Sequence, residues 1–188
     1  MINLLFDGAV FKVLTIFSLA AGRRFRRNEL KEMTCLNNVL IDNALAKLLK
    51  AGVLNAERKI YSANLENENA KQLIAVISRQ YKALRELPLD AYFTITDIAA
   101  AFSKLKQAEL FLFGSYAKLV YKKGSDIDMA VVSGTKIDSA TFEKKIIKLE
   151  KKYGLKAELH FFDRTLFYKN KKDPLVKEIL RNGIKLDC

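Results

Sequence analysis

Two aspartates separated by one residue, Asp126 and Asp128, stand directly before the apolar run Met129–Val132. On a strand, residues i and i+2 face the same side at roughly 6.5 Å, so both carboxylates would share one face. Two such carboxylates repel each other unless a cation lies between them, and hard divalent ions prefer carboxylate oxygens together with nucleotide phosphates. The spacing therefore indicates metal-assisted phosphoryl chemistry. The alternative is a surface turn in which water solvates both aspartates.

A second polar feature precedes the aspartates by about a dozen residues. Gly114 and Ser115 follow the apolar run Leu110–Phe113, which suits a buried strand, and precede a segment, 116–120, that suits a helix. At such a junction the backbone N–H groups and the hydroxyl point at one spot and favour a phosphate, while glycine permits close approach of a ligand. The two features together favour a nucleotide site.

This pattern resembles the polymerase-beta-type nucleotidyltransferase superfamily, in particular its minimal, kanamycin-nucleotidyltransferase-like members. The hallmark is a strand, Gly-Ser, then Asp-x-Asp at this distance, and Gly114, Ser115, Asp126 and Asp128 match it residue by residue. The resemblance covers about residues 95–188. It implies transfer of a nucleoside monophosphate from a nucleoside triphosphate to an acceptor hydroxyl. Asp126 and Asp128 would be catalytic ligands of Mg²⁺ or Mn²⁺, and Gly114 and Ser115 would bind the nucleotide.

The family pattern requires a third carboxylate on a later strand. Residues 155–162 read as that strand, and alternation places Glu158 and His160 on one face. Glu158 is the candidate third metal ligand, or the base that takes the proton of the attacking hydroxyl, although the family more often has aspartate there. The alternatives are an edge glutamate exposed to water and, for His160, the only histidine, a structural role rather than assistance at the site.

The segment between the two motifs departs from the family. Members usually carry a glycine shortly after Ser-x-Ala, where this chain has Leu119, followed by the bulky residues Val120 and Tyr121. We therefore expect a differently shaped loop up to Gly124, which affects the choice of substrate more than metal binding.

The N-terminal half resembles a winged helix-turn-helix domain. Pro88 disfavours helix at the residue before it, so we place the boundary between domains 1–88 and 89–188 there. The apolar periodicity of the first domain predicts helices over 8–21, 28–33, 38–51 and 69–84, and strands over 53–56 and 60–63.

A DNA-binding role for this domain rests on its polar and basic residues. The predicted helix 38–51 would lie in the major groove, where asparagine can bond adenine edges, and cations on the hairpin would contact phosphates. The candidate residues are Asn38, Asn43, Lys47, Arg58 and Lys59. The alternative is a structural or dimerising winged helix that packs against a protein partner, with its basic residues merely solvated.

In the second domain, runs and alternation predict an α/β (α+β) fold with a mixed β-sheet flanked by helices. The expected strands are 110–113, 129–132, 155–162 and 184–186. One expected helix begins near Thr94, and three more cover 116–120, 139–153 and 174–182.

Charge and composition narrow the class of protein without separating the roles of the two halves. The chain carries 33 basic and 21 acidic residues, a formal charge of +12. Residues 1–90 contribute 14 minus 9, or +5, and the remainder 19 minus 12, or +7. The two cysteines do not form a disulfide framework, and no apolar run reaches the roughly 18 residues of a membrane span, so we expect a cytoplasmic protein with no membrane partner.

Two functions remain open on the sequence alone. The first is an active, metal-dependent nucleotidyltransferase joined to a DNA-binding winged helix. The second is a non-catalytic DNA-binding regulator or antitoxin-like protein that binds nucleotide or a toxin-like helical partner, as the resemblance allows, and an oligomer is compatible with either.

Overall fold

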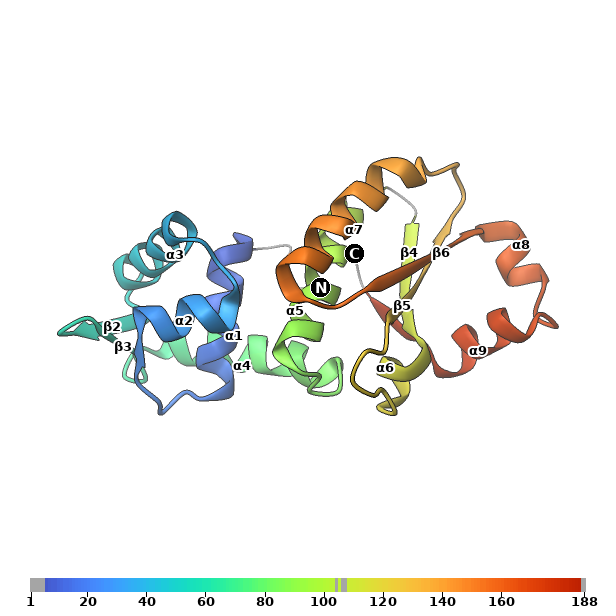
Figure 1. Cartoon of the computed structure of the whole chain (residues 1–188). Helices are drawn as coiled ribbons and strands as arrows, with labels where there is room; N and C mark the ends of the chain where they lie inside the picture. Colours follow the sequence, from blue (N-terminus) through green and yellow to red (C-terminus); the bar gives the residue numbers. More distant parts are fainter. Residues whose placement is uncertain (1–5, 104, 106–107, 187–188) are drawn as a thin grey trace. The chain divides into compact units, whose positions relative to one another are not determined.

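The computed structural model describes residues 6–186 apart from 104, 106 and 107. Contacts divide the chain into two compact units that meet between Leu89 and Asp90, one residue beyond the boundary expected from Pro88. Figure 1 shows the two units, and each is described here by itself.

The N-terminal unit combines helices with a short antiparallel sheet in the strand order β1-β3-β2. The predicted helices and hairpin are confirmed to within a few residues. Strand β1 was not predicted, because two residues carry no periodicity and its partner β3 lies far along the chain. The elements are α1 (Gly8–Leu19), β1 (Phe25–Arg26), α2 (Arg27–Thr34), α3 (Asn38–Lys50), β2 (Leu54–Glu57), β3 (Ile60–Ala63) and α4 (Glu68–Ala83).

Side-chain caps and aromatic packing hold this unit together. Asp7 caps α1 by accepting from the amide of Ala9 at 2.9 Å, and Asn37 caps α3 in the same way. Phe17 of α1 meets Phe25 of β1 edge to face, with ring centres 5.3 Å apart. Both rings are fully buried, so the short strand is anchored to the core by its one inward side chain.

The C-terminal unit is built on a mixed sheet in the order β6-β5-β4-β7. Strands β5 and β6 are parallel, whereas β4 is antiparallel to both of its neighbours. The predicted mixed α/β class is thereby confirmed. The elements are α5 (Leu89–Phe102), β4 (Ala108–Phe113), α6 (Gly114–Lys118), β5 (Ile127–Ser133), α7 (Ser139–Tyr153), β6 (Ala157–Asp163), α8 (Arg164–Lys169), α9 (Pro174–Asn182) and β7 (Ile184–Leu186).

Three helices of this unit differ from expectation. Helix α6 covers Gly114–Lys118 instead of 116–120, so Gly114 and Ser115 belong to its first turn. Helix α5 begins at Leu89 instead of near Thr94, because the restriction imposed by Pro88 falls on the residue before it and leaves the following residues free to be helical. Helix α8 was not predicted. It is six residues long, and Asp163 caps it by accepting from the amide of Leu166 at 2.9 Å.

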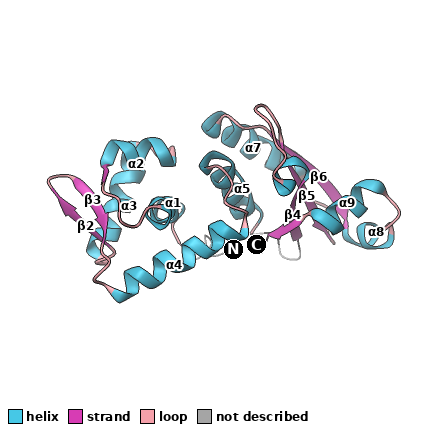
Figure 2. Cartoon of the chain, turned by 90° about the horizontal axis from the view of Figure 1, so that it is seen from below, coloured by secondary structure: helices cyan, strands magenta, loops and turns pink. Residues whose placement is uncertain are grey.

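Different helices cover the two faces of the sheet, as Figure 2 shows from below. On the face of α5 and α7, Phe102 stacks on Phe142 with ring centres 4.1 Å apart and also meets Phe161 of β6. On the other face, a cluster centred on Phe167 of α8 packs against the strands. The members of that cluster are Phe111, Phe113, Ala130, Val132, Phe167, Val176 and Ile179.

An ionic network connects the first residues of β4 with β7 and α8. The Glu109 carboxylate, 14% exposed, accepts hydrogen bonds from the Lys185 ammonium and, at 2.6 Å, from the Tyr168 hydroxyl, with Arg164 at 3.8 Å. Burial raises the pKa of Glu109, but the bonds from Lys185 and Tyr168 outweigh burial and leave the pKa below its ordinary value. Burial and the bond to Glu109 raise the pKa of Tyr168 to about 12.

Glu109→Gln should therefore destabilise the C-terminal unit in a pH-dependent way. A carboxyl whose pKa is depressed on folding adds stability that is present above its unfolded pKa, 4.5, and is lost as pH falls through the folded value. We expect urea unfolding, followed by circular dichroism, to show a loss of about 2 kcal/mol at pH 7 that shrinks toward pH 3. The exposed Glu143→Gln on α7 is the matched control, and equal losses for Glu109→Gln at both pH values would contradict the network.

Candidate functional site

The candidate site lies where one end of β4 meets the first residues of β5 and β6. In the sheet register Phe113 is opposite Asp128, and Asp128 is opposite Glu158 on the neighbouring parallel strand. Cross-strand partners point to the same face of a sheet, so the two carboxylates come from sequence positions 30 residues apart and meet side by side. The face is the one that α8 and α9 cover farther along the strands.

Gly114 brings the strand-to-helix turn against Asp128. Its backbone adopts φ +68°, a left-handed conformation that favours glycine, and a Cβ atom there would lie 2.0 Å from Oδ2 of Asp128. The backbone N–H of Ser115 donates a hydrogen bond to Asp128. Gly114 and Ser115 are the first two residues of α6, and the Ser115 amide is directed at a carboxylate of the site.

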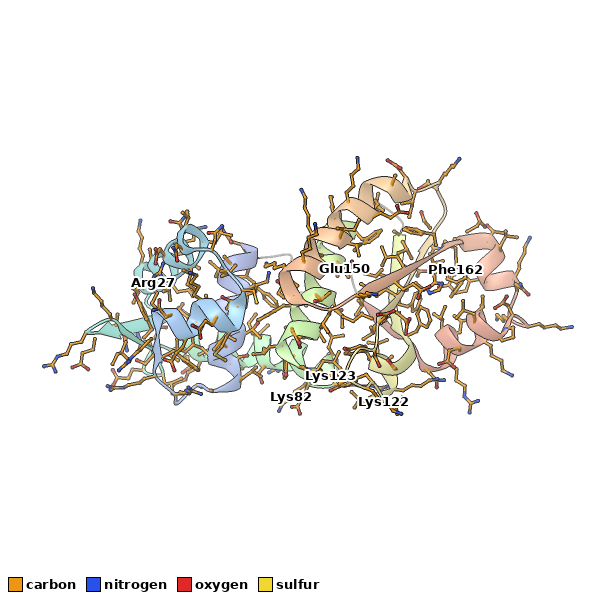
Figure 3. The ribbon with its side chains drawn as sticks, in the orientation of Figure 1. Arg27, Lys82, Lys122, Lys123, Glu150 and Phe162 are labelled. Atoms are coloured by element: carbon orange, nitrogen blue, oxygen red, sulfur yellow. The ribbon has the colours of Figure 1, made fainter. Side chains whose placement is uncertain are left out.

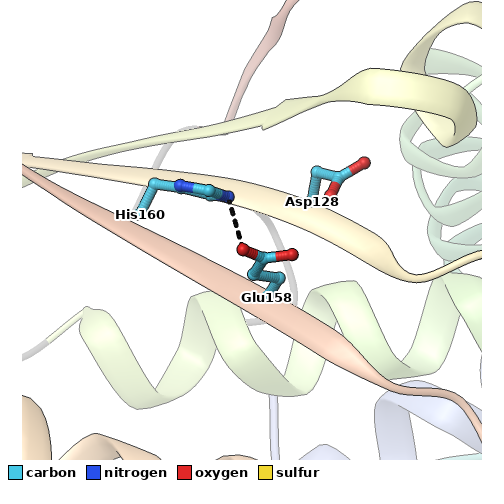
Figure 4. Close-up of side chains that lie close together, drawn as sticks. All are labelled: Asp128, Glu158 and His160. Carbon is cyan, nitrogen blue, oxygen red and sulfur yellow. Dashed lines mark ion pairs between the residues drawn. The ribbon is translucent and has the colours of Figure 1, made fainter. Parts of the chain in front are cut away.

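Asp128, Glu158 and His160 form a close group. One ligand atom from each lies within 4.8 Å of the others. Nε2 of His160 is 3.3 Å from Oε1 of Glu158, and Figure 4 shows Asp128 beside this pair. The His160 ring is held edge to face against Phe113, with ring centres 5.3 Å apart. Glu158 is exposed, whereas Asp128 and His160 are half-buried, so the group is reachable from solvent at one side.

The electrostatics of Asp128 show the cost of bringing these carboxylates together. Burial raises the pKa of Asp128, and the negative charges of Glu158 and Asp126 raise it further. His160 and the Ser115 amide act in the opposite direction without reversing the shift. The chain's own groups therefore stabilise the charged form of Asp128 less than water does. A cation bound beside it would stabilise that charged form.

Asp126, the other predicted aspartate ligand, lies just before β5 and outside the strand itself. Strand β5 begins at Ile127, and the side chain of Asp126 is exposed. It is not one of the three residues that form the close group, although its charge acts on Asp128. His160 completes the group instead. The alternation of β6 placed His160 beside Glu158 from the sequence, but nothing in the sequence distinguished assistance at the site from a structural role.

The loop after α6 begins with a left-handed residue that is not glycine. Leu119, at the position where glycine is usual, has φ 60° and ends α6 in the left-handed conformation. Tyr121 stacks on Tyr116 with ring centres 4.5 Å apart and planes inclined by 3°. Lys122 and Lys123, labelled in Figure 3, follow Tyr121 in the chain and are exposed. The loop therefore carries two exposed cations directly after an aromatic pair.

The predicted DNA-contacting residues all lie in the N-terminal unit and are exposed. Lys47 of α3 is engaged by Asp7, with Nζ 2.7 Å from Oδ2. Arg58 and Lys59 form the tip of the β2–β3 hairpin, and both have positive φ, 49° and 64°. Asn38 and Asn43 lie on the outer side of α3.

Arg27, labelled in Figure 3, forms a two-pronged ion pair on the same surface. Its Nε and Nη2 donate to the two oxygens of Asp42 at 2.5 and 2.8 Å. The surface of α3 also carries an exposed apolar residue, Val39, which is 66% exposed. Arg27 and Lys47 are thus paired within the unit, and the exposed surface of α3 also carries Asn38, Val39, Asn43 and Lys50.

One known protein family matches the part of the chain that contains this site. Residues 95–186 match the family model of the nucleotidyltransferase domain, which supports the nucleotidyltransferase superfamily for this part of the chain. No curated protein matches the chain. Within the part of the chain that the structure describes, no helix has the length and apolar character needed to traverse a bilayer.

Gly114→Ala should disturb the site through the Asp128 carboxylate. Gly154 is the matched control, because its φ is +73° but nothing lies within 4 Å of an added Cβ. We expect Gly154→Ala to cost about 1 kcal/mol of unfolding free energy for the left-handed backbone. Gly114→Ala should cost about 1–3 kcal/mol more, because the added carbon overlaps the carboxylate. Equal losses in urea unfolding would show that Asp128 does not press on the turn.

Proposed function

We propose that the C-terminal unit is a metal-dependent nucleotidyltransferase that transfers a nucleoside monophosphate from a nucleoside triphosphate to an acceptor hydroxyl. The observation that carries the proposal is the meeting of Asp128 and Glu158 at 4.8 Å or less beside the Gly114-Ser115 turn. The match of residues 95–186 to the nucleotidyltransferase domain supports it independently.

The donor set fits a divalent cation. Asp128 and Glu158 offer carboxylate oxygens, and Asp126 adds a third negative charge that acts on the same point. Mg²⁺ and Mn²⁺ are bound in proteins by such oxygens together with substrate phosphates. When bound, the cation supplies Lewis-acid stabilisation of the charge that develops on the phosphoryl oxygens. Asp128 and Glu158 would hold it, with Asp126 at the exposed side.

The remaining chemistry belongs to the chain's own groups. The acceptor oxygen forms a bond to the α-phosphorus, the bond to the bridging oxygen breaks, and pyrophosphate leaves. The Ser115 hydroxyl and the exposed Lys122 and Lys123 would bind the phosphates, since charge-assisted bonds to phosphate are the strong ones. Glu158 is exposed, so in the alternative to holding the cation it could be the base that accepts the proton of the acceptor hydroxyl.

For the N-terminal unit we propose a winged helix that contacts DNA. The order helix, strand, helix, helix, hairpin and the sheet order β1-β3-β2 support the winged helix. The hairpin tip supports nucleic-acid contact, because Arg58 and Lys59 occupy a left-handed turn that glycine or asparagine adopts more readily. Their charges are consequently displayed at the most exposed point of the sheet.

The alternative function is a non-catalytic regulator or antitoxin-like protein. The paired charges of Arg27 and Lys47 and the exposed Val39 favour it, because they leave α3 less basic than a phosphate-binding surface usually is. In that case the C-terminal unit would bind nucleotide without turnover, and the N-terminal unit would bind a helical partner protein or a second copy of the chain.

Asp128→Asn should abolish transfer while leaving the fold intact, because it removes one of the two central carboxylates and keeps the shape. The measurement is incorporation of label from α-³²P nucleoside triphosphates into the protein and nucleic-acid fractions of an extract, with Glu143→Gln as control. We expect label with the wild type and the control, and at least about a 100-fold loss with Asp128→Asn. Equal labelling by Asp128→Asn and the wild type would remove the proposed site, and triphosphate binding without any labelling would favour the regulator.

Removing the two cations of the hairpin tip should weaken DNA binding and make that binding less dependent on salt. If Arg58 and Lys59 each neutralise one phosphate, the slope of log K against log salt, which is negative, becomes less steep by about 2 in the double alanine variant. Lys82→Ala, at the end of α4, is the control (Figure 3). An unchanged slope in a fluorescence-anisotropy titration with duplex DNA would contradict phosphate contact by the hairpin.

A further inference from the structure

The geometry of His160 differs from that of a histidine buried for packing. Its Nε2 is 3.3 Å from Oε1 of Glu158, and the side chain is 29% exposed. Its neighbour across the sheet is Ala130, whose side chain has no polar atom, and one ligand atom each of Asp128 and Glu158 lies within 4.8 Å of an imidazole nitrogen. The imidazole nitrogen is therefore directed into the group of oxygens (Figure 4).

The ring is also held in place. Phe113 meets it edge to face at 5.3 Å, and Phe113 is itself 95% buried at the end of β4. Both residues belong to strands of one sheet, not to loops, so the position of the nitrogen relative to the carboxylates is fixed by the register of three neighbouring strands. Donor groups fixed in this way lose little conformational entropy when they bind a metal ion.

We propose that His160 is a direct ligand of the cation at Asp128 and Glu158, and that it makes the site favour nitrogen-preferring divalent ions over Mg²⁺. The inference rests on the proposed function in one respect, the presence of a divalent cation at these carboxylates. Oxygen-only sites suit Mg²⁺, whereas an imidazole donor suits Co²⁺, Ni²⁺ and Zn²⁺. One nitrogen and two carboxylate oxygens form the donor set of such an ion and leave positions open for substrate phosphate.

A purely structural role for His160 leads to different chemistry. A protonated imidazole would neutralise Glu158 as an ion pair and would then compete with any cation for the carboxylate. A ligand and a competitor have opposite effects when the imidazole is removed. Loss of the ligand weakens binding of Co²⁺ selectively, and loss of the competitor strengthens binding of every divalent ion.

The test uses the untagged full chain and the metal ions alone, without nucleotide. Co²⁺ and Mg²⁺ are titrated separately by calorimetry into the wild type, His160→Gln and Glu158→Gln, with thermal unfolding as the check on folding. We expect His160→Gln to weaken Co²⁺ binding by 10-fold to 100-fold, about the loss typical of a disturbed metal site, and Mg²⁺ binding by less than about 3-fold. Glu158→Gln should weaken both ions, because its oxygen serves either one.

A spectroscopic readout assigns the ligand directly. The chain contains one histidine, so a paramagnetically shifted imidazole resonance in the proton NMR spectrum of the Co²⁺ form belongs to His160. Its presence in the wild type and absence in His160→Gln supports the inference. Equal weakening of Co²⁺ and Mg²⁺ in His160→Gln, no change, or tighter binding overturns it while leaving the carboxylate site intact. Failure of the wild type to bind either ion overturns both the inference and the metal site of the proposed function.

Discussion

The parallel pairing of β5 with β6 places two carboxylates of like charge, Asp128 and Glu158, opposite each other. This arrangement opposes folding, because burial and the neighbouring charge both raise the pKa of Asp128. The hydrophobic clusters on the two faces of the sheet hold the strands in register and offset this cost. The packing of the rest of the unit keeps the two carboxylates together despite their repulsion. A cation bound between them would reduce that repulsion.

The same pair of carboxylates also restricts which residue can follow β4. Gly114 can take no side chain because Asp128 occupies the space, and the Ser115 amide is directed at the carboxylate. The loop beyond it then bends through Leu119 and places Lys122 and Lys123 at the exposed side. The signature residues are thus connected physically: one strand end orients the carboxylate, and the carboxylate determines which residue the turn can use.

Much of this could be predicted from the sequence because it is local. Periodicity located the helices and the strands of the sheet, the Gly-Ser and Asp-x-Asp spacing pointed to Gly114 and Asp128, and alternation together with the family resemblance pointed to Glu158. What could not be predicted depends on tertiary pairing. Strand β1 depends on its pairing with β3, Lys47 is engaged by Asp7, the residue that caps α1, and Asp126 is outside the group of Asp128, Glu158 and His160. The grouping of His160 with the carboxylates is of the same kind.

The most direct test of the account is a crystal structure of the full chain with Mn²⁺ and a nucleoside triphosphate whose α–β bridge cannot be cleaved. We expect anomalous density for Mn²⁺ between the carboxylates of Asp128 and Glu158, with the triphosphate beside Ser115. A nucleotide bound elsewhere, or Mn²⁺ absent from between these two carboxylates, would contradict the central claim that their meeting forms a nucleotidyl-transfer site.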